Sequence, residues 1–340
     1  MTASPLPAPQ NTGVVIAGTG SAVPDRVMSN ADLEKVMDTS GEWIMQRTGI
    51  RERRVFTPGK ETNASLGADS LRDALLSAST DASELDLLIV ATMTADMPTP
   101  SASCLIADSI GAGNIGAWDF NAACSGFVFA LNSAHALIRD GMARTIGLVG
   151  VDLVTRFLDY STFGRGAAIL FGDAAGAVVL KADTDTTKGL LAQSMHSDGG
   201  GSKHLFVPGC FADFSNADDA EQRKLGKVQM NGQAIFRFAV SKFPTLIADT
   251  LDKASLDADD VDHYICHQSN LRILNAARER FGLAEDKLYV NVDRYGNTVA
   301  ASVPLVLDEL TKSGRVHEGQ RVMFLGFGAG LTWGSSLWQL

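Results

Sequence analysis

Unbroken runs of Val, Ile and Leu recur along the chain, separated by segments in which apolar positions have a helical spacing. Apolar runs without polar alternation are typical of strands that are buried on both faces. The runs predicted as strands are 13–18, 85–92, 116–121, 145–151, 176–180, 261–267, 288–292 and 321–325. The predicted helices are 62–78, 101–110, 126–140, 271–281 and 299–313. This alternation predicts an α/β protein with parallel sheets that are covered by helices.

The same order of elements occurs twice along the chain. The apolar run that begins at Leu85 matches the one that begins at Val261, which gives an offset of 261 − 85 = 176 in sequence number. The glycines after two of the predicted helices are offset by 314 − 141 = 173, and the runs that open the two copies are offset by 188 − 13 = 175. These offsets predict two similar halves, residues 13–185 and 186–340. The proline-rich residues 1–12 are predicted to form a disordered tail.

Length and composition fit a large, well-packed protein. The chain has 340 residues, of which 45% are hydrophobic and 20% are charged, and this balance excludes a disordered chain or a coiled coil. The net charge is 29 − 39 = −10, which argues against a protein that binds nucleic acid through phosphate contacts. An acidic partner therefore needs a local basic patch on this surface.

The sequence also lacks motifs for membrane insertion, secretion and metal binding. Without a run of about 18 apolar residues, we expect no membrane span. The N-terminal segment lacks the basic and apolar regions of a signal peptide, so we expect a cytoplasmic protein. No two cysteines have a C-x-x-C spacing, and we therefore expect neither a metal site nor a disulfide framework. The cysteines are Cys104, Cys124, Cys210 and Cys266.

Cys124 lies in a turn of small residues between a predicted strand and a predicted helix. The N–H groups and the dipole at a helix N-terminus favour a thiolate, so this position predicts a nucleophile with a lowered pKa. The alternative is a buried cysteine that packs as a small apolar residue. Cys104, within a predicted helix, and Cys266, within a predicted strand, fit that alternative better.

Two further side chains follow predicted strands. His267 ends a buried strand at the carboxyl edge, where parallel sheets place their sites, although a histidine packed in the core is an alternative. Asn297 follows a tight turn at the start of a predicted helix, and an N-cap is its simpler interpretation. The offset 297 − 124 = 173 nevertheless places Cys124 and Asn297 in corresponding turns of the two halves. We therefore expect them to face each other across a pseudo-twofold axis.

Cysteine peptidases also combine a cysteine, a histidine and an amide side chain. The separation of Cys124 and His267 in sequence number, 267 − 124 = 143, fits their spacing. Against a peptidase, Cys124 lies in mid-chain in an AACSG context, and the duplicated α/β pattern does not suit that fold.

Six segments together resemble the 3-oxoacyl-[acyl-carrier-protein] synthase III family of the thiolase superfamily. They are WIMQRTGIRERR, AACSGFVFAL, FGDAAGAVVL, HQSNLRI, DRYGNTVAASVPLVLDE and GFGAGLTWGSSL, and the resemblance extends from Gly13 to Leu340. It implies a thiolase-like, duplicated five-layer αβαβα fold, with two pseudo-twofold related halves and mixed sheets rich in parallel strands. It also implies a homodimer.

The resemblance further implies a role for each catalytic candidate. Cys124 matches the nucleophile that takes an acyl group from acyl-CoA as a thioester. His267 and Asn297 match the pair that promotes decarboxylation of malonyl-ACP and stabilises the enolate. The oxyanion of the acyl group is expected to bind the backbone N–H groups of Cys124 and Ala329. Ala329 replaces a glycine that is usual in the family, and its Cβ requires a reshaped loop if this position needs a positive φ.

Binding residues follow from the same resemblance. The CoA contacts are expected from Trp43 and Arg165, which match an adenine-stacking pair, from Arg47, and from Asn270 in the pantetheine tunnel. Arg272 and Arg278 are candidates for docking the acidic carrier protein, with a solvated helix face as the alternative. Thr99 and Phe327 are assigned to the acyl pocket. Thr99 matches a residue that the partner subunit contributes, and its small size predicts primers longer than acetyl.

These observations predict an enzyme that condenses acyl-CoA with malonyl-ACP and so initiates fatty-acid synthesis, without a cofactor. The first alternative is a related enzyme with the same three residues that acts in secondary metabolism or transfers acyl groups to other acceptors. A cysteine-dependent thioester hydrolase and a non-enzymatic acyl-binding protein are further alternatives.

Overall fold

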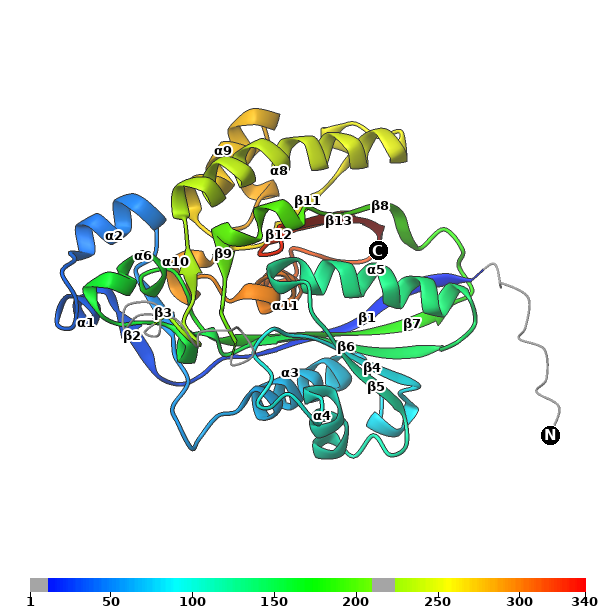
Figure 1. Ribbon diagram of the computed structural model, residues 1–340. Coiled ribbons are helices and arrows are strands. Elements are labelled where there is room, and N and C mark those ends of the chain that lie inside the picture. Colours follow the sequence, from blue (N-terminus) through cyan, green and yellow to red (C-terminus); the bar gives the residue numbers. More distant parts are fainter. Residues whose placement is uncertain (1–11, 210–223) are drawn as a thin grey trace.

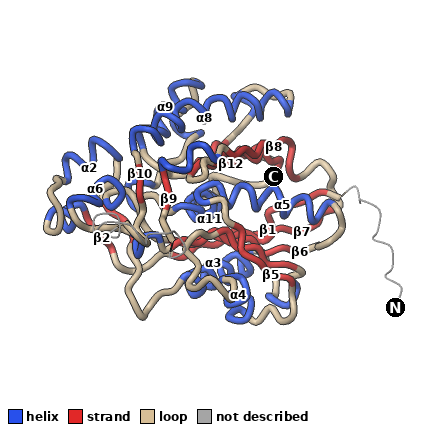
Figure 2. The backbone as a smooth tube through the Cα atoms, in the orientation of Figure 1, coloured by secondary structure: helices blue, strands red, loops and turns tan. Residues whose placement is uncertain are grey.

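The computed structural model describes residues 12–209 and 224–340, which form five stacked layers (Figure 1). Two β-sheets enclose a central helical layer, and further helices cover the outer face of each sheet (Figure 2). The central helices are α5 (Gly126–Arg139) and α11 (Ser302–Lys312). The outer helices are α3 (Asn63–Ser77) and α4 (Ala102–Ile110) on one side, and α8 (Gly232–Ala254) and α9 (Leu271–Phe281) on the other. The predicted αβαβα arrangement is confirmed.

The two sheets have the same strand order. The first is β1-β7-β6-β4-β5, with strands Gly13–Ala22, Ala174–Asp183, Thr145–Asp152, Leu87–Ala91 and Gly116–Phe120. The second is β8-β13-β12-β11, with strands Gly189–Ser197, Thr332–Gln339, Arg321–Gly328 and His263–Cys266. The neighbours β4 and β6 are parallel, as are β11 and β12, whereas β7 and β13 run antiparallel to both of their neighbours. Both sheets are therefore mixed and contain parallel strands, as the family resemblance implies. The apolar runs alone did not reveal the antiparallel strands, because burial on both faces does not fix strand direction.

The repeat extends to the pairing register. Leu87 of β4 pairs with Ile146 of β6, and His263 of β11 pairs with Val322 of β12. The second-half numbers exceed their first-half counterparts by the same amount, 263 − 87 = 322 − 146 = 176. The predicted division at residues 185 and 186 falls between β7 and β8, and it stays a prediction.

One predicted strand, 288–292, is wrong. A single parallel bridge joins Leu288 to Tyr264, and the chain then enters the short helix α10 (Val292–Tyr295). The side chain of Gln268 takes the place of a neighbouring strand there, because its Oε1 accepts the backbone N–H of Asn291 at 3.0 Å and that of Val292 at 3.2 Å. The second sheet consequently lacks a full counterpart of β5.

Short elements surround the end of the molecule at which the catalytic candidates lie. They are β2 (Val27–Ser29), α1 (Asn30–Glu34), α2 (Gly41–Thr48), β3 (Glu52–Arg54), α6 (Arg165–Ala168), β9 (Leu205–Phe206) and β10 (Gln229–Met230). Helix α2 begins where the Ser40 hydroxyl accepts the N–H of Trp43, and it ends at Gly49, whose φ of 75° is the left-handed conformation that favours glycine.

Some sequence predictions concern residues that lie wholly or largely outside the described ranges. These are the tail, of which only residue 12 is described, and Cys210. Within the described ranges, no helix is both long and apolar enough to cross a bilayer. Across the same residues, no group of three or more His, Cys, Asp and Glu side chains is arranged to hold a metal ion.

Candidate active site

Cys124 occupies a tight turn between β5 and α5. The turn is the 3-10 segment Ala123–Ser125, and Ala123 has a φ of 47°, which is uncommon for a residue with a side chain. The backbone N–H groups of Cys124 and Ala329 lower the pKa of the thiol, but burial and the negative charge of Asp152 outweigh them and raise the pKa of Cys124 to about 12. The lowered pKa predicted from the helix N-terminus is therefore wrong. Burial outweighs the N–H donors because it removes water from the charged form.

The loop that follows β12 brings Ala329 to Cys124 without a positive φ at Ala329. The added Cβ at this position thus imposes no left-handed strain. The Thr332 hydroxyl ties the same loop to the cysteine turn, because it lies 3.1 Å from the carbonyl of Ala122 and 3.0 Å from that of Ala329.

Asn297 is held on three sides. Its backbone N–H donates to Leu170 O at 2.8 Å, its carbonyl accepts the N–H of Gly172 at 3.0 Å, and its side-chain Oδ1 accepts the N–H of Val299 at 2.9 Å. With Oδ1 occupied, the amide NH₂ is the group that Asn297 offers to the cavity that it lines. The N-cap interpretation is wrong, because Thr298 is the N-cap of the 3-10 segment Val299–Ala301 and Asn297 instead closes a turn onto the N–H of Val299.

His267 follows β11 directly and is almost fully buried. Its Nδ1 lies 2.7 Å from the Ser302 hydroxyl, and its ring meets that of Phe327 edge-on with centroids 5.4 Å apart. Burial lowers the pKa of His267 to about 3, so the imidazole is neutral at physiological pH. The Ser302 hydroxyl has a single proton, which it can donate either to Nδ1 or to the Val299 carbonyl 2.9 Å away. Donation to Nδ1 places the ring proton on Nε2, where it is available as a neutral donor.

Cys124, His267 and Asn297 all line one cavity of about 520 Å³. Eight of the residues predicted from the sequence line its wall: Trp43, Arg47, Cys124, His267, Asn270, Arg272, Asn297 and Phe327. The simpler interpretations were a histidine packed in the core and a cysteine packed as a small apolar residue. Both are incomplete, since His267 and Cys124 are buried and yet line the cavity.

Trp43 lies at this cavity with two guanidinium groups beside its indole. The Cζ of Arg47 is 5.0 Å from the ring centroid, and that of Arg165 is 4.9 Å from it. Arg165 is not on the cavity wall itself, although the next residue, Gly166, is. Asn270 caps α9 by accepting the N–H of Arg272 at 2.8 Å, while its amide donates to the carbonyl of Arg47 at 3.0 Å.

The other predicted residues lie away from the cavity wall. Thr99 is in an exposed loop after β4. Arg278 lies on α9 and pairs with Glu285 at 3.4 Å, whereas Arg272 lines the cavity with its guanidinium 5.1 Å from the ring centroid of Phe236. The two arginines are therefore not equivalent, because one faces the cavity and the other is engaged by a carboxylate.

Much of the apolar wall was not predicted from the sequence. Phe236 and Phe238 line the cavity from the first turns of α8, a helix that was not predicted. Six buried apolar side chains pack with Cys124: Val154, Leu158, Ala167, Phe171, Val228 and Val299. The aromatic pair in the segment GQAIFRF was the one available signal, but apolar spacing alone does not distinguish a cavity wall from a core.

The predicted equivalence of Cys124 and Asn297 needs correction. The offset that relates the strands pairs Cys124 with Ala300 and Asn297 with Asn121 (124 + 176 = 300 and 121 + 176 = 297). Both asparagines make the same turn, because Asn121 Oδ1 accepts the N–H of Ala123 at 3.2 Å, as Asn297 does with that of Val299. The Cys124 thiol and the Asn297 amide thus lie at different positions of a turn that occurs once in each half.

Gly328 allows β12 to approach the nucleophile. A Cβ at this position would lie 2.7 Å from the Cβ of Cys124 and 3.1 Å from its sulfur. We predict that Gly328→Ala slows acylation of Cys124 by about 100-fold, since a shift near 1 Å at a reacting group has an effect of this order. Intact-mass spectrometry against time after addition of acyl-CoA measures the rate. Gly199→Ala is the control, because a Cβ there meets no heavy atom within 4 Å; equal rates in the two variants would contradict the prediction.

Comparison with protein families gives two matches. Residues 118–199 match the family model described as 3-oxoacyl-[acyl-carrier-protein (ACP)] synthase III, and residues 251–340 match the model of its C-terminal part. Among curated proteins, the chain is similar to the beta-ketoacyl-[acyl-carrier-protein] synthase III of Xylella fastidiosa (strain 9a5c). The two are 44% identical over 323 residues, which cover 95% of this chain and 97% of the relative.

Solved structures agree with these matches. The 3-oxoacyl-[acyl-carrier-protein] synthase III of Aquifex aeolicus VF5 superimposes with a TM-score of 0.88 at 36% identity, over 97% of this chain and 100% of that one. The priming beta-ketosynthase of the R1128 polyketide pathway superimposes with a TM-score of 0.90 at 34% identity, over 99% of each chain. The similarity therefore extends over nearly the whole chain and includes the cysteine turn.

Proposed function

Because this chain belongs to the 3-oxoacyl-[acyl-carrier-protein] synthase III family, we propose that it condenses an acyl-CoA primer with malonyl-ACP and thereby initiates fatty-acid synthesis. The observation that carries the proposal is the single cavity that Cys124, His267 and Asn297 all line. A thiol for acyl transfer and two neutral donors for an enolate are the groups that this condensation needs. CoA thioester and carrier protein are substrates in this proposal, and no cofactor takes part.

The first half-reaction loads the enzyme. The Cys124 sulfur attacks the thioester carbonyl, the bond to the CoA sulfur breaks, and the proton of Cys124 leaves with CoA. The N–H groups of Cys124 and Ala329, which favour negative charge at the sulfur in the free site, are the expected donors to the oxyanion of the tetrahedral intermediate. Because the pKa of the thiol is raised, attack is expected to require deprotonation in step with the approach of the thioester.

The second half-reaction forms the carbon–carbon bond. Malonyl-ACP loses CO₂, and the negative charge moves to its thioester oxygen as an enolate. Neutral His267 and the Asn297 amide supply two hydrogen bonds to that oxygen. The enolate carbon attacks the acyl carbonyl on Cys124, the carbon–sulfur bond breaks, and the thiol takes up a proton to complete the cycle.

The cavity mouth suits a nucleotide and a carrier protein. Trp43, Arg47 and Arg165 combine an indole with two guanidinium groups, which favours stacking on adenine and attraction to phosphates. Arg272 at the cavity provides positive charge for an acidic carrier protein, despite the net charge of −10. Arg278 is the weaker docking candidate because Glu285 already pairs with it.

A homodimer is part of the proposal. Strand β5 lies at the edge of its sheet, and Trp118 on it is 37% exposed. An unpaired edge with an apolar side chain favours pairing with another chain. Thr99 is exposed on the loop after β4, where a second copy would present it to the acyl pocket of its partner. The cytoplasmic location stays a prediction.

We predict that Thr99→Phe shifts the primer preference toward acetyl-CoA. A bulky ring at the end of an apolar pocket excludes longer chains, so kcat/KM for hexanoyl-CoA is expected to fall about 10-fold or more relative to acetyl-CoA. Competition between the two acyl-CoAs, read out by mass spectrometry of the product, measures the ratio. Thr99→Val keeps the size and serves as the control. Strict acetyl preference in the unmodified protein would overturn the role of Thr99.

The condensation is tested by incubating the protein with a panel of acyl-CoAs and malonyl-ACP. We expect 3-oxoacyl-ACP, CoA and CO₂ in equal amounts. Free acid as the product would favour the hydrolase, and acylation without any product would favour an acyl-binding protein. An acyl-enzyme that persists with malonyl-ACP and is discharged by another nucleophile would favour the secondary-metabolism alternative. The 44% identity to a fatty-acid enzyme over 95% of the chain favours condensation.

A further inference from the structure

Asp152, the last residue of β6, is a fully buried carboxylate to which the reaction above assigns no role. Its Oδ1 accepts the N–H of Met93 at 2.9 Å and the hydroxyls of Thr94 and Thr92 at 2.8 and 3.2 Å. Its Oδ2 accepts the N–H of Ala300 at 3.1 Å. No Lys, Arg or His of the described ranges forms an ion pair with it, so these neutral donors alone stabilise the carboxylate.

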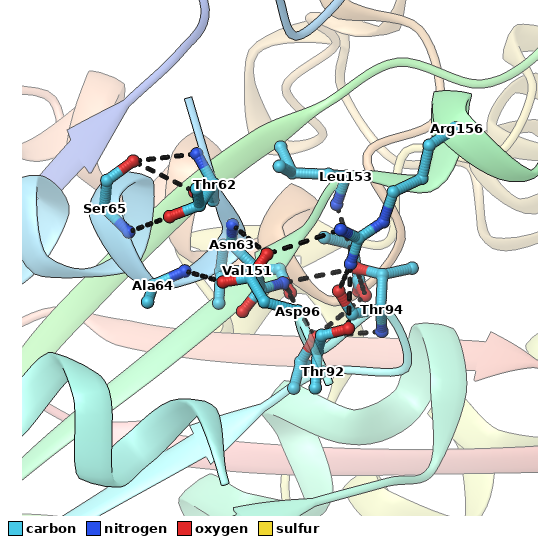
Figure 3. Close-up of polar contacts among 12 residues, drawn as sticks. Thr62, Asn63, Ala64, Ser65, Thr92, Thr94, Asp96, Val151, Leu153 and Arg156 are labelled. Carbon is cyan, nitrogen blue, oxygen red and sulfur yellow. Dashed lines mark hydrogen bonds and ion pairs between the residues drawn. The ribbon is translucent and has the colours of Figure 1, made fainter. Parts of the chain in front are cut away.

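The donors on one side of Asp152 are rigidly placed. Figure 3 shows Thr92 and Thr94 joined to Asn63, whose amide donates to both hydroxyls at 3.1 and 3.2 Å and to Val151 O at 3.2 Å. Arg156 donates to the carbonyl of Ala95 at 2.9 Å and pairs with Asp96 at 3.3 Å. A hydrogen-bonded loop of the N-terminal half therefore supplies all the donors to one oxygen of the carboxylate, Oδ1.

The other end of the carboxylate reaches the repeated turn of the C-terminal half. Ala300 is the counterpart of Cys124, and Asp152 is the counterpart of Gly328 (152 + 176 = 328). At Gly328 the absent side chain leaves room for the thiol. At Asp152 a carboxylate fills the equivalent space and accepts the N–H of Ala300, the counterpart of the Cys124 N–H that lowers the pKa of the thiol.

Ala300 lies inside the segment that carries the decarboxylation groups. One residue earlier, Val299 binds the Oδ1 of Asn297 through its N–H, and its carbonyl lies 2.9 Å from the Ser302 hydroxyl. The same hydroxyl lies 2.7 Å from Nδ1 of His267. Val299 has a φ of 53°, which a β-branched residue adopts only when its surroundings hold it there. The contact from Asp152 to Ala300 is one such restraint.

We propose that Asp152 is a positioning residue, which fills the unused copy of the oxyanion site and thereby holds the Asn297–Ser302 turn for decarboxylation of malonyl-ACP. The kinetic part of this proposal rests on the proposed function. Asp152 acts through the turn and touches neither substrate. Its removal should therefore slow the second half-reaction and leave acyl transfer to Cys124 largely intact.

The test is Asp152→Asn, which keeps the shape but cannot accept hydrogen bonds at both ends. We expect malonyl-ACP decarboxylation to fall about 10- to 100-fold, while acylation of Cys124 is not slowed. Thr94→Val, which removes one donor and keeps the side-chain shape, is expected to slow the same step by a smaller factor. It keeps the test decisive if the Asp152 variant fails to fold.

Asp308→Asn is the matched control. Asp308 is a buried carboxylate on α11 that also joins the two halves, through the hydroxyls of Thr19 and Ser21 at 2.8 and 2.6 Å, without contacting the turn. Decarboxylation in this variant should stay within about twofold of the unmodified protein. An equal loss in both variants, or no loss in Asp152→Asn, would overturn the proposal.

A second readout does not depend on the proposed function. The ionisable group that shifts the pKa of Cys124 is Asp152, whose charge raises it, while His267 lines the same cavity but is neutral. Loss of the Asp152 charge should therefore speed alkylation of Cys124 by iodoacetamide at pH 8, as followed by intact-mass spectrometry. Unchanged alkylation would contradict the placement of Asp152. If the unmodified protein does not decarboxylate malonyl-ACP, the proposed function fails, whereas the alkylation result still stands.

Discussion

Cys124→Ala should form no acyl-enzyme from any acyl-CoA, and its condensation rate should fall by about 10⁴-fold or more, as expected for the loss of a nucleophile. The two other cysteines of the described ranges do not line the cavity. Cys104 is exposed on α4 and Cys266 is buried within β11, and Cys210 lies outside the described residues. Intact-mass spectrometry after incubation with acyl-CoA measures the adduct directly.

The same variant should retain decarboxylation of malonyl-ACP, because the donors of His267 and Asn297 do not depend on the thiol. We expect this rate to stay within about tenfold of the unmodified protein. Cys104→Ala is the matched control and should keep full acylation. An acyl adduct that survives in Cys124→Ala would show that another residue is the nucleophile.

His267→Ala and Asn297→Ala should each slow decarboxylation of malonyl-ACP by about 10²- to 10³-fold, the usual effect of removing one donor to a developing oxyanion. Acylation of Cys124 should be much less affected, since the groups that favour negative charge at the sulfur are the backbone N–H groups of Cys124 and Ala329. Release of labelled CO₂ measures the first rate, and intact-mass spectrometry measures the second.

His263→Ala separates this role from the mere presence of a histidine on β11. His263 lies on the same strand, is half-buried, and bonds to the carbonyl of Arg315 at 3.0 Å away from the cavity. Its loss should leave decarboxylation nearly unchanged.

In the unmodified protein the contribution of His267 should be constant from about pH 5 to 9. Its lowered pKa, about 3, keeps the imidazole neutral throughout this range. Burial raises the pKa of Asp152 to about 6, so a decarboxylation rate that follows protonation near pH 6.5 contradicts a neutral His267 only when it persists in Asp152→Asn.

Much of the fold could be predicted because its strands are buried on both faces. The runs at β4, β6 and β12 are continuously apolar, and the offset between repeated segments of the sequence is also the offset between paired strands of the two sheets. Strand direction could not be predicted, because β7 shows the same apolar pattern as its neighbours and runs opposite to them. Residues 288–292 do not form the predicted strand, because the side chain of Gln268 binds two of the backbone N–H groups at the end of this segment. No local sequence pattern reveals that contact.

The catalytic residues were predictable because each follows a strand or a tight turn, which places a side chain at the sheet edge. Properties that depend on tertiary burial were not. The pKa of Cys124 moves opposite to the prediction, since the helix N-terminus is a local feature and desolvation is not. Phe236 and Phe238 reach the cavity from a helix that was not predicted. The side chain of Asp152 is held by the N–H groups of Met93 and Ala300, which are distant from it in the sequence.

In the proposed mechanism, one cavity holds an acyl group on Cys124 and then delivers it to an enolate made by His267 and Asn297. The most direct test is a single-turnover chase. The protein is loaded with a ¹³C-labelled acyl group, freed of CoA, and mixed with malonyl-ACP or with buffer alone. We predict that malonyl-ACP discharges the label into 3-oxoacyl-ACP with one CO₂ for each acyl group, while the buffer sample keeps its adduct. Label recovered as free acid at the same rate in both samples would contradict this mechanism.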